Sequence, residues 1–273
     1  MKQLFIAAGI SMLVLAAPAA QAQELFTYTE PASNMPAKSL GIRLTNNLMG
    51  EEHLGQTTYL FLPELMWGVN KNLMLHAEGI FSNSSATFKP IGVGTYAKYR
   101  LYSHDDVHRH FRMAAFGRAA YNEGHVHYEE LETNGINTGY ELGLIATQLL
   151  HKQAISASLS YEQVMNNGGT GNELHEGRAF RGLNYTLSTG RLILPKRYIS
   201  YKQTNLNLML ELMGQQLPDN GRYYVDIAPS LQLIVNSQTR IDLGYRRQLG
   251  GTMERMATSS VLIRVEHLLF NLL

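Results

Sequence analysis

Hydrophobic and polar residues alternate with a period of two along most of this chain. Ile155, Ala157, Leu159 and Tyr161, for example, are separated by three serines. A period of two places successive side chains on opposite faces of a β-strand. The pattern recurs in twelve segments, at residues 40–44, 59–67, 73–81, 93–101, 112–119, 140–144, 155–162, 183–188, 205–212, 225–233, 240–246 and 261–266. The sequence therefore predicts an all-β protein of about 12 strands.

The connections between these segments alternate in length. Short connections are predicted near residues 69–72, 103–109, 150–152, 195–198 and 235–238. Generally longer ones, rich in Gly, Asn, Glu and His, are predicted near residues 49–56, 83–89, 122–136, 165–179, 215–221 and 249–256. An even number of antiparallel strands with short turns at one end and long loops at the other is typical of outer-membrane barrels. We therefore predict a single antiparallel transmembrane β-barrel over residues 38–273, with short periplasmic turns and long extracellular loops.

The strands of a soluble β-sandwich in the periplasm would also show alternating hydrophobic and polar residues, because one face of each sheet is buried and the other is exposed to solvent. Two features favour the barrel. Charges lie in the middle of predicted strands, as in Lys98-x-Arg100 and Arg240-x-Asp242. Aromatic residues gather near both ends of the strands, as the two girdles of a barrel require. Those near the short turns are Trp67, Tyr99, Tyr102, Phe111, Tyr198 and Tyr201, and those near the long loops are Tyr59, Tyr121, Tyr140, Tyr161, Tyr185, Tyr224 and Tyr245.

The first 22 residues have the composition of a secretory signal peptide. Lys2 gives the positive start, residues 4–17 are mostly apolar, and Ala20-Gln21-Ala22 forms a small-residue cleavage site. The apolar run is shorter than the roughly 20 residues of a membrane helix, and nothing in residues 23–273 approaches that length. We expect residues 1–22 to be removed and the remainder to be exported through the cell envelope to the outer membrane.

Cysteine usage and charge narrow the choice of stabilising bonds and partners. The chain has no Cys, so disulfides do not stabilise it in an oxidising compartment. Residues 23–273 carry 22 basic and 22 acidic side chains. Proteins that bind nucleic acids usually carry a basic excess, so no nucleic-acid partner is expected.

Two stretches resemble outer-membrane β-barrels of Gram-negative bacteria such as the Bacteroidota. They are the opening Tyr28-Thr29-Glu30-Pro31-Ala32-Ser33-Asn34-Met35-Pro36-Ala37-Lys38-Ser39-Leu40 and the turn Gly68-Val69-Asn70-Lys71-Asn72-Leu73. The resemblance implies a porin-like or transporter-associated protein, a membrane of outer-membrane lipid and contact with the barrel-assembly machinery. Many such barrels end in an aromatic residue, whereas this chain ends in Leu273, with Phe270 as its nearest aromatic.

If the apolar face of each strand contacts lipid, the charged face points into the lumen, because Arg or Lys in mid-membrane costs roughly 2–4 kcal/mol. The predicted inward bases are Arg43, Lys98, Arg100, Arg112, Arg118, Arg240, Arg246 and Arg264. The predicted inward acids are Glu64, Glu78, Glu141, Glu162, Glu211, Asp226, Asp242 and Glu266. The candidate lumen residues among them are Glu78, Lys98, Arg100, Arg112, Arg118, Glu141, Arg240, Asp242, Arg246, Arg264 and Glu266.

Two interpretations of these charges remain open. Opposed basic and acidic walls would select small polar solutes in a water-filled pore. In that case Arg100, Arg112, Arg118, Glu78 and Glu141 line the constriction. Alternatively, the side chains pair across strands and fill a narrow lumen, since 12 strands lie between filled barrels of roughly 8 and open porins of roughly 16. Residues 23–37 either thread the lumen as a plug or hang in the periplasm.

Histidines on the predicted long loops suggest weak metal-binding candidates. His53, His125, His127 and His175 each lie near carboxylates, and imidazole with carboxylate suits Zn, Cu or Ni. No spacing matches a defined metal site, so no firm metal site and no cofactor are predicted. The turn histidines His104, His108 and His110 are interpreted as solvated side chains.

An enzymatic role is the least favoured alternative. A barrel phospholipase needs Ser and His side by side on the lipid face near the outer leaflet. His151 and His267 fall at the opposite end of the predicted strands, and His76 faces inward. The sequence therefore predicts a narrow channel for passive passage of a small polar solute or ion. The alternatives are a non-conducting barrel whose loops bind a metal ion or partner, and a barrel enzyme acting on lipid.

Overall fold

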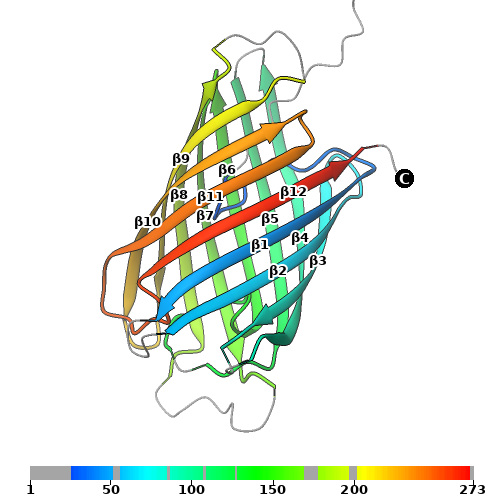
Figure 1. Cartoon of the computed structure of the whole chain (residues 1–273). Helices are drawn as coiled ribbons and strands as arrows, with labels where there is room; N and C mark the ends of the chain where they lie inside the picture. The colour runs from blue at the N-terminus through cyan, green and yellow to red at the C-terminus, as the bar shows by residue number, and fades with distance from the viewer. Residues whose placement is uncertain are drawn as a thin grey trace, which may run out of the picture.

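The strands of this protein close into one antiparallel barrel. The computed structural model describes residues 26–51, 56–84, 87–106, 109–126, 128–168, 178–196 and 202–270. The strands are β1 (Ser39–Glu51), β2 (Gln56–Gly68), β3 (Leu73–Ser82), β4 (Lys89–Asp106), β5 (Arg109–Asn122), β6 (Thr138–Leu150), β7 (Gln153–Met165), β8 (Arg181–Leu194), β9 (Asn205–Gln216), β10 (Tyr223–Val235), β11 (Thr239–Gly251) and β12 (Ser259–Leu269). Each pairs with its neighbours in sequence, and β1 also pairs with β12. The predicted 12-stranded barrel is confirmed, and the sandwich is excluded because the sheet has no open edge (Figure 1).

The outer face of the barrel is apolar from strand to strand. Leu144, Leu159 and Tyr185 are direct cross-strand neighbours on β6, β7 and β8, and they are 53%, 61% and 40% exposed. Charged residues on the same face lie near strand ends, as Arg181 and Arg247 do. Soluble proteins rarely expose apolar patches of more than a few hundred Å². No helix in the described ranges is long and apolar enough to cross a membrane.

The two ends of the barrel differ in what connects the strands. The terminal end carries the start of β1, the end of β12 and the turns after β2, β4, β6, β8 and β10; the loop end carries the other connections. Between β4 and β5 only residues 107 and 108 lie outside the strands, and only residues 151 and 152 do so between β6 and β7. Residues 123–137 form the loop between β5 and β6, which is long as predicted.

Two predicted connections were wrong in length, and a third is short as predicted but has different bounds. The predicted turn at residues 103–109 is largely strand, because the β4–β5 pairing continues to Asp106 and Arg109. The connection after β8 runs from Leu194 to Asn205 and is longer than predicted, whereas the connection after β1 comprises only residues 52–55. Hydrogen-bonded pairing beyond the apolar part of a strand is not visible in hydrophobic periodicity, which explains why the β4–β5 and β1–β2 connections are shorter than the predicted ranges.

One predicted girdle residue points the wrong way. Tyr224 is 7% exposed and faces the lumen, on the same side of β10 as Asp226, so its assignment to the outer girdle was wrong. Tyr121, Tyr140 and Tyr245 are exposed on the outer face at the loop end. At the terminal end Trp67, Tyr99 and Tyr102 are likewise exposed. The predicted girdle residues Tyr198 and Tyr201 lie outside the described residues.

Candidate functional site

Charged side chains on the inner face pair across the seam where the barrel closes. Arg43 of β1 donates to Glu266 of β12 through Nε at 2.8 Å and lies 3.4 Å from Glu64 of β2. Arg240 of β11 forms ion pairs with the same Glu266 at 3.0 Å and with Asp242 at 3.1 Å. All five side chains are nine-tenths or more buried. Removing one partner of such a pair leaves an uncompensated buried charge, so this network fixes the β1–β12 closure.

The N-terminal residues 26–38, which we call the plug segment, lie against the inner face of the barrel, and one carboxylate holds the start of the segment. Glu211 of β9 accepts hydrogen bonds from the backbone nitrogens of Thr27, Tyr28 and Thr29, at 2.9, 3.0 and 2.8 Å. It also accepts one from Thr29 Oγ1 at 2.8 Å. Glu211 is fully buried. A buried carboxylate that meets several N–H groups is well satisfied, so this contact fixes the start of the segment.

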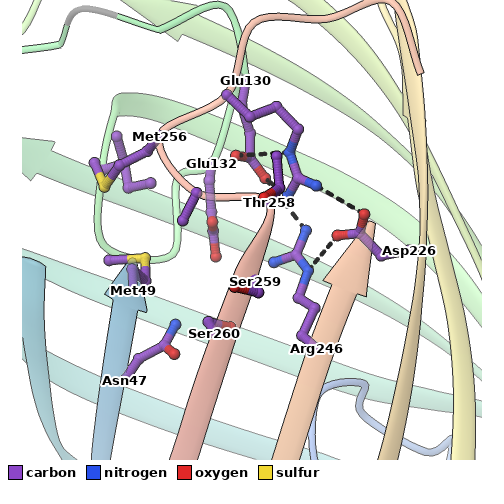
Figure 2. Close-up of a pocket in the computed structure, with 13 residues that line it drawn as sticks. Asn47, Met49, Glu130, Glu132, Asp226, Arg246, Met256, Thr258, Ser259 and Ser260 are labelled. Atoms are coloured by element: carbon purple, nitrogen blue, oxygen red, sulfur yellow. Dashed lines mark hydrogen bonds and ion pairs between the residues drawn. The ribbon is translucent and has the colours of Figure 1, made fainter. Parts of the chain in front are cut away.

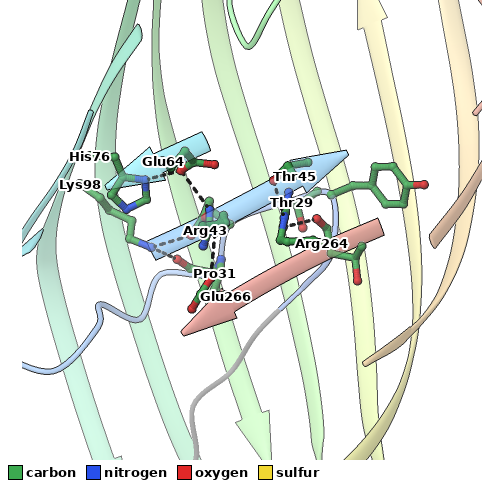
Figure 3. Close-up of polar contacts among 12 residues, drawn as sticks. Thr29, Pro31, Arg43, Thr45, Glu64, His76, Lys98, Arg264 and Glu266 are labelled. Carbon is green, nitrogen blue, oxygen red and sulfur yellow. Dashed lines mark hydrogen bonds and ion pairs between the residues drawn. The ribbon is translucent and has the colours of Figure 1, made fainter. Parts of the chain in front are cut away.

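A second anchor holds the middle of the plug segment by charge. Glu30 accepts from Arg43 Nη1 at 2.8 Å and from Lys98 Nζ at 3.3 Å. The Lys98 ammonium also donates to the carbonyl oxygen of Pro31 at 2.7 Å, and Lys98 is fully buried. Figure 3 shows Arg43 of β1 and Lys98 of β4 pointing toward the segment. Lys98 therefore binds the plug segment and does not line an open pore.

Further contacts tie the plug segment to β5, β6 and β12. Arg264 donates to the carbonyl oxygen of Thr27 at 2.6 Å, and the backbone nitrogen of Ala32 donates to Thr147 Oγ1 at 2.9 Å. Arg112 donates from Nη1 to Ser33 Oγ at 2.8 Å.

Two glycines allow the close approach of the plug segment. A Cβ atom at Gly68 would lie 2.1 Å from the carbonyl oxygen of Pro36, and one at Gly244 would lie 2.6 Å from the ring of Tyr28. Any larger residue would push the segment off β2 or β11. The segment thus fits the lumen sterically as well as through hydrogen bonds.

The loop end of the lumen is occupied by residues 123–126 and 128–137, which we call the inner loop. Leu131 donates its backbone N–H to Gln215 Oε1 at 3.0 Å and accepts from Gln215 Nε2 at 2.7 Å. Thr133 donates its backbone N–H to Glu162 Oε1 at 2.6 Å. Leu131 and Thr133 are 2% and 1% exposed, so this loop lies inside the barrel mouth.

A group of charges, which we call the latch, fastens the inner loop. Arg255, on the β11–β12 connection, pairs with Glu130 of the inner loop at 2.6 Å and with Asp226 of β10 at 2.7 Å. Its guanidinium lies 3.8 Å from the ring centre of Tyr224. Figure 2 shows Arg246 extending toward the same carboxylates, and its distance to Glu130 is 3.2 Å. Burial disfavours the charged form of Glu130, but the Arg255 and Arg246 guanidiniums outweigh burial and lower its pKa.

Between the plug segment and the inner loop lies a chamber of about 200 Å³. Tyr28, Thr29 and Glu30 form part of one wall, residues 131–134 form part of another, and inward side chains of the strands complete it. Water occupies roughly 30 Å³ per molecule in the liquid, so the chamber has room for several waters or a small polar solute. The plug segment and the inner loop therefore leave a space between them in the lumen.

The chamber is lined by both signs of charge. Arg118 of β5 lies 3.9 Å from Glu141 of β6 and 5.3 Å from the ring centre of Tyr96. Glu132 of the inner loop also faces the chamber, and burial together with the Glu130 carboxylate raises the pKa of Glu132 to about 7. The Tyr96 hydroxyl is buried without a hydrogen-bond partner among the described residues. These groups can hydrogen-bond a polar solute.

The structure separates the candidate lumen residues into distinct places. Arg118, Glu141, Arg246 and Arg264 line the chamber, whereas Arg100 and Arg112 line a second cavity at the terminal end. Lys98, Arg240, Asp242 and Glu266 belong to the plug anchor and the seam. Glu78 lies against Gly94 on the inner face. The five residues expected to line one constriction are thus divided among separate parts of the lumen.

The histidine candidates are largely outside the described part of the chain. His53, His127 and His175 lie outside the described residues, as does the turn residue His108, and His125 is exposed on the inner loop. No group of three or more potential metal ligands occurs among the residues that the structure describes.

Sequence reasoning missed the charged residues that lie outside the strands. Glu30, Glu130, Glu132 and Arg255 all contact or line the lumen, yet none belongs to a period-two segment. One usable signal was present: the apolar residues Leu131 and Ile136 lie in a loop that is mostly polar, and both are buried.

Comparison with known proteins shows likeness in fold. No protein-family model and no curated protein matches this chain. An outer-membrane channel from Pseudomonas putida F1 superimposes with a TM-score of 0.56 at 11% identity, covering 90% of this chain and 100% of the channel. The NanC porin gives 0.49 at 11% identity, covering 85% and 100%, and the KdgM porin gives 0.46 at 10%, covering 83% and 98%. At such low identity the Pseudomonas channel shares the barrel fold, and a substrate does not follow from it.

Proposed function

We propose that this protein is an outer-membrane channel for small polar solutes or ions, closed at rest by the plug segment and the inner loop. The apolar outer face supports a position in the membrane, and the fold shared with an outer-membrane channel agrees with it. Export by a signal peptide, assembly by the barrel-assembly machinery and an origin in the Bacteroidota remain predictions from the sequence. The proposal makes the protein a channel and not an enzyme.

One observation carries the proposal: two peptide segments, and not the side chains of the strands alone, occupy the lumen. In small barrels the inward side chains fill the interior. Here the plug segment and the inner loop fill it, each through non-covalent bonds to the wall, and a polar chamber of about 200 Å³ lies between them. Segments held in this way can leave without unfolding the barrel. A gated passage explains this arrangement better than a permanently filled core does.

The test is single-channel conductance of the refolded protein, residues 23–273, in planar lipid bilayers. We expect discrete but infrequent current steps, with a reversal potential under a salt gradient that reports charge selectivity. A heat-modifiable, folded barrel that gives no steps, even when the plug anchor at Glu211 is weakened, would refute the channel proposal. Function would then be sought in the loops.

A further inference from the structure

The rim of the barrel at the terminal end contains a cavity that the channel proposal does not use. The last residue of β4 that pairs with β3 is Tyr99, opposite Leu73, yet β4 continues to Asp106 in pairing with β5. The β4–β5 hairpin therefore extends beyond β3. A cavity of about 830 Å³ lies there, between the hairpin, plug residues 33–37 and the β2–β3 turn. We call it the vestibule.

Two arginines with unused hydrogen-bonding capacity face the vestibule. Arg112 is 3% exposed; its Nη1 and Nη2 donate to Ser33 and to Asp105, at 2.8 and 3.0 Å, but its Nε has no hydrogen-bond partner in the described part of the chain. Arg100 forms no ion pair within the described residues, and its Nε is buried without a hydrogen-bond partner. Buried donors without partners cost free energy, and a bound acceptor would remove that cost.

The charge in the vestibule is unbalanced. Among the described residues that line it, Arg100, Arg112 and Lys71 contribute three positive charges, whereas Asp105 contributes the one carboxylate. That carboxylate is already shared between Arg112 at 3.0 Å and His110 at 2.8 Å. On the adjacent strands β4 and β5, Arg100 is directly opposite Ala114, which is two residues from Arg112. Such diagonal neighbours lie roughly 7–8 Å apart. This spacing lets both guanidiniums reach one ligand with two or more oxygens.

The vestibule also opens toward the outer face. Tyr99, Leu101 and Tyr102 line it and are 50%, 55% and 52% exposed. They surround an irregularity in the β4–β5 register between Arg100 and Tyr102, where the strand bends. One cavity thus joins two arginines to apolar and aromatic side chains at the edge of the outer face. A ligand could reach it from water or from the membrane surface.

We propose that the vestibule binds an oxyanion, a phosphate or carboxylate group, through Arg100 and Arg112. Guanidinium groups recognise both anions by paired, charge-assisted hydrogen bonds. The oxyanion comes either from a free solute or from the head group of a lipid whose chains lie along Tyr99 and Leu101. This site goes beyond the proposed channel, since a barrel that never conducts would still bind the anion.

The test measures binding by two probes. Inorganic phosphate is titrated into the refolded protein in non-ionic detergent by calorimetry, and retention of phosphatidylglycerol is measured by native mass spectrometry. Arg100→Gln should weaken binding about 10- to 100-fold, as loss of a charge-assisted contact does. Asp105→Asn removes the competing carboxylate and should tighten binding several-fold. Arg191→Gln, at an exposed arginine on β8, is the matched control and should bind like wild type.

Each outcome decides the proposal. If only phosphate binds in an Arg100-dependent way, the ligand is a free solute. If only phosphatidylglycerol does, the ligand is a lipid head group. If both do, the site recognises the oxyanion group that they share. Wild type that binds neither probe, or binding that is unchanged in both Arg100→Gln and Asp105→Asn, overturns it. Conductance is measured separately, so failure of the channel proposal would be distinguished from failure of this one.

Discussion

The carboxylate of Glu211 provides the sharpest test of plug docking. It is fully buried and accepts four hydrogen bonds of 3.0 Å or less from Thr27, Tyr28 and Thr29. We predict that Glu211→Gln will release the plug segment in a measurable fraction of molecules while leaving the barrel folded. Gln keeps the shape of the side chain, so the change removes charge and one acceptor without opening a cavity.

The magnitude follows from the contacts of a single oxygen. Oε2 of Glu211 accepts from the backbone nitrogen and from Oγ1 of Thr29, both at 2.8 Å, and an amide nitrogen in its place cannot accept. Hydrogen bonds to charged groups contribute roughly 1.5–3 kcal/mol each. The smaller cost of burying a neutral amide offsets part of the loss. We therefore expect docking to weaken by about 2–4 kcal/mol, which raises the undocked fraction about 30- to 1,000-fold.

Hydrogen exchange of the amides of residues 27–29 reports that fraction directly, because these amides are protected only when docked. Current steps in planar bilayers should become more frequent in the same variant. Glu162→Gln is the matched control: it removes a buried carboxylate that holds the inner loop at Thr133, so residues 27–29 should stay protected. If Glu211→Gln leaves both exchange and conductance as in wild type, the assignment of Glu211 as the plug anchor is wrong.

Three further predictions concern the latch and the chamber. Arg255→Gln breaks two buried ion pairs, to Glu130 at 2.6 Å and to Asp226 at 2.7 Å, and should cost roughly 3–5 kcal/mol in the free energy of unfolding, measured by urea titration. Burial and the Glu130 carboxylate raise the pKa of Glu132 from 4.5 to about 7, so the folded protein binds a proton that the unfolded chain releases between these pH values. Its contribution to stability therefore falls as pH rises through that window, and Glu132→Gln should be more stable than wild type near pH 8 but similar near pH 4. Arg118→Glu reverses the charge opposite Glu141 in the chamber and should shift the reversal potential of the channel toward cation selectivity.

Each of these has a result that would contradict it. An Arg255→Gln variant with wild-type stability would mean that the latch does not hold the inner loop. A constant stability difference between Glu132→Gln and wild type from pH 4 to 8 would show that Glu132 does not titrate in that range. Unchanged selectivity in Arg118→Glu would remove the chamber from the conduction path. Arg191→Gln serves as a charge control for the selectivity measurement.

The barrel was predictable because its causes are local. Side chains in a strand alternate between two faces whatever the rest of the fold does, so Arg43, Arg240 and Asp242 could be placed inside from their own neighbours. Tyr224 was wrongly predicted to face the membrane because it lies near a loop. It is two residues from Asp226 on β10 and therefore shares the inner face with it. The length of the β4–β5 hairpin was missed because pairing beyond the apolar band leaves no hydrophobic period.

The candidate site was predictable only in part. The sequence placed charges on the inner face but could not pair them, since Lys98 finds its partner Glu30 across 68 residues of sequence. The partners of Glu211, and the partner Glu130 of Arg255, likewise lie on segments without periodicity. Whether an inward charge lines a cavity or holds a peptide depends on what else enters the lumen.

The sequence by itself determined the number of strands, their inward and outward faces and the charged character of the lumen, because a period of two is set by the geometry of each strand alone. The tertiary structure decided that the plug segment and the inner loop occupy that lumen, that a chamber separates them and that Arg100 and Arg112 face a different cavity from Arg118. These features arise from contacts between residues far apart in the chain, such as Thr27 with Glu211 and Glu130 with Arg255, and they exist only once the barrel has closed.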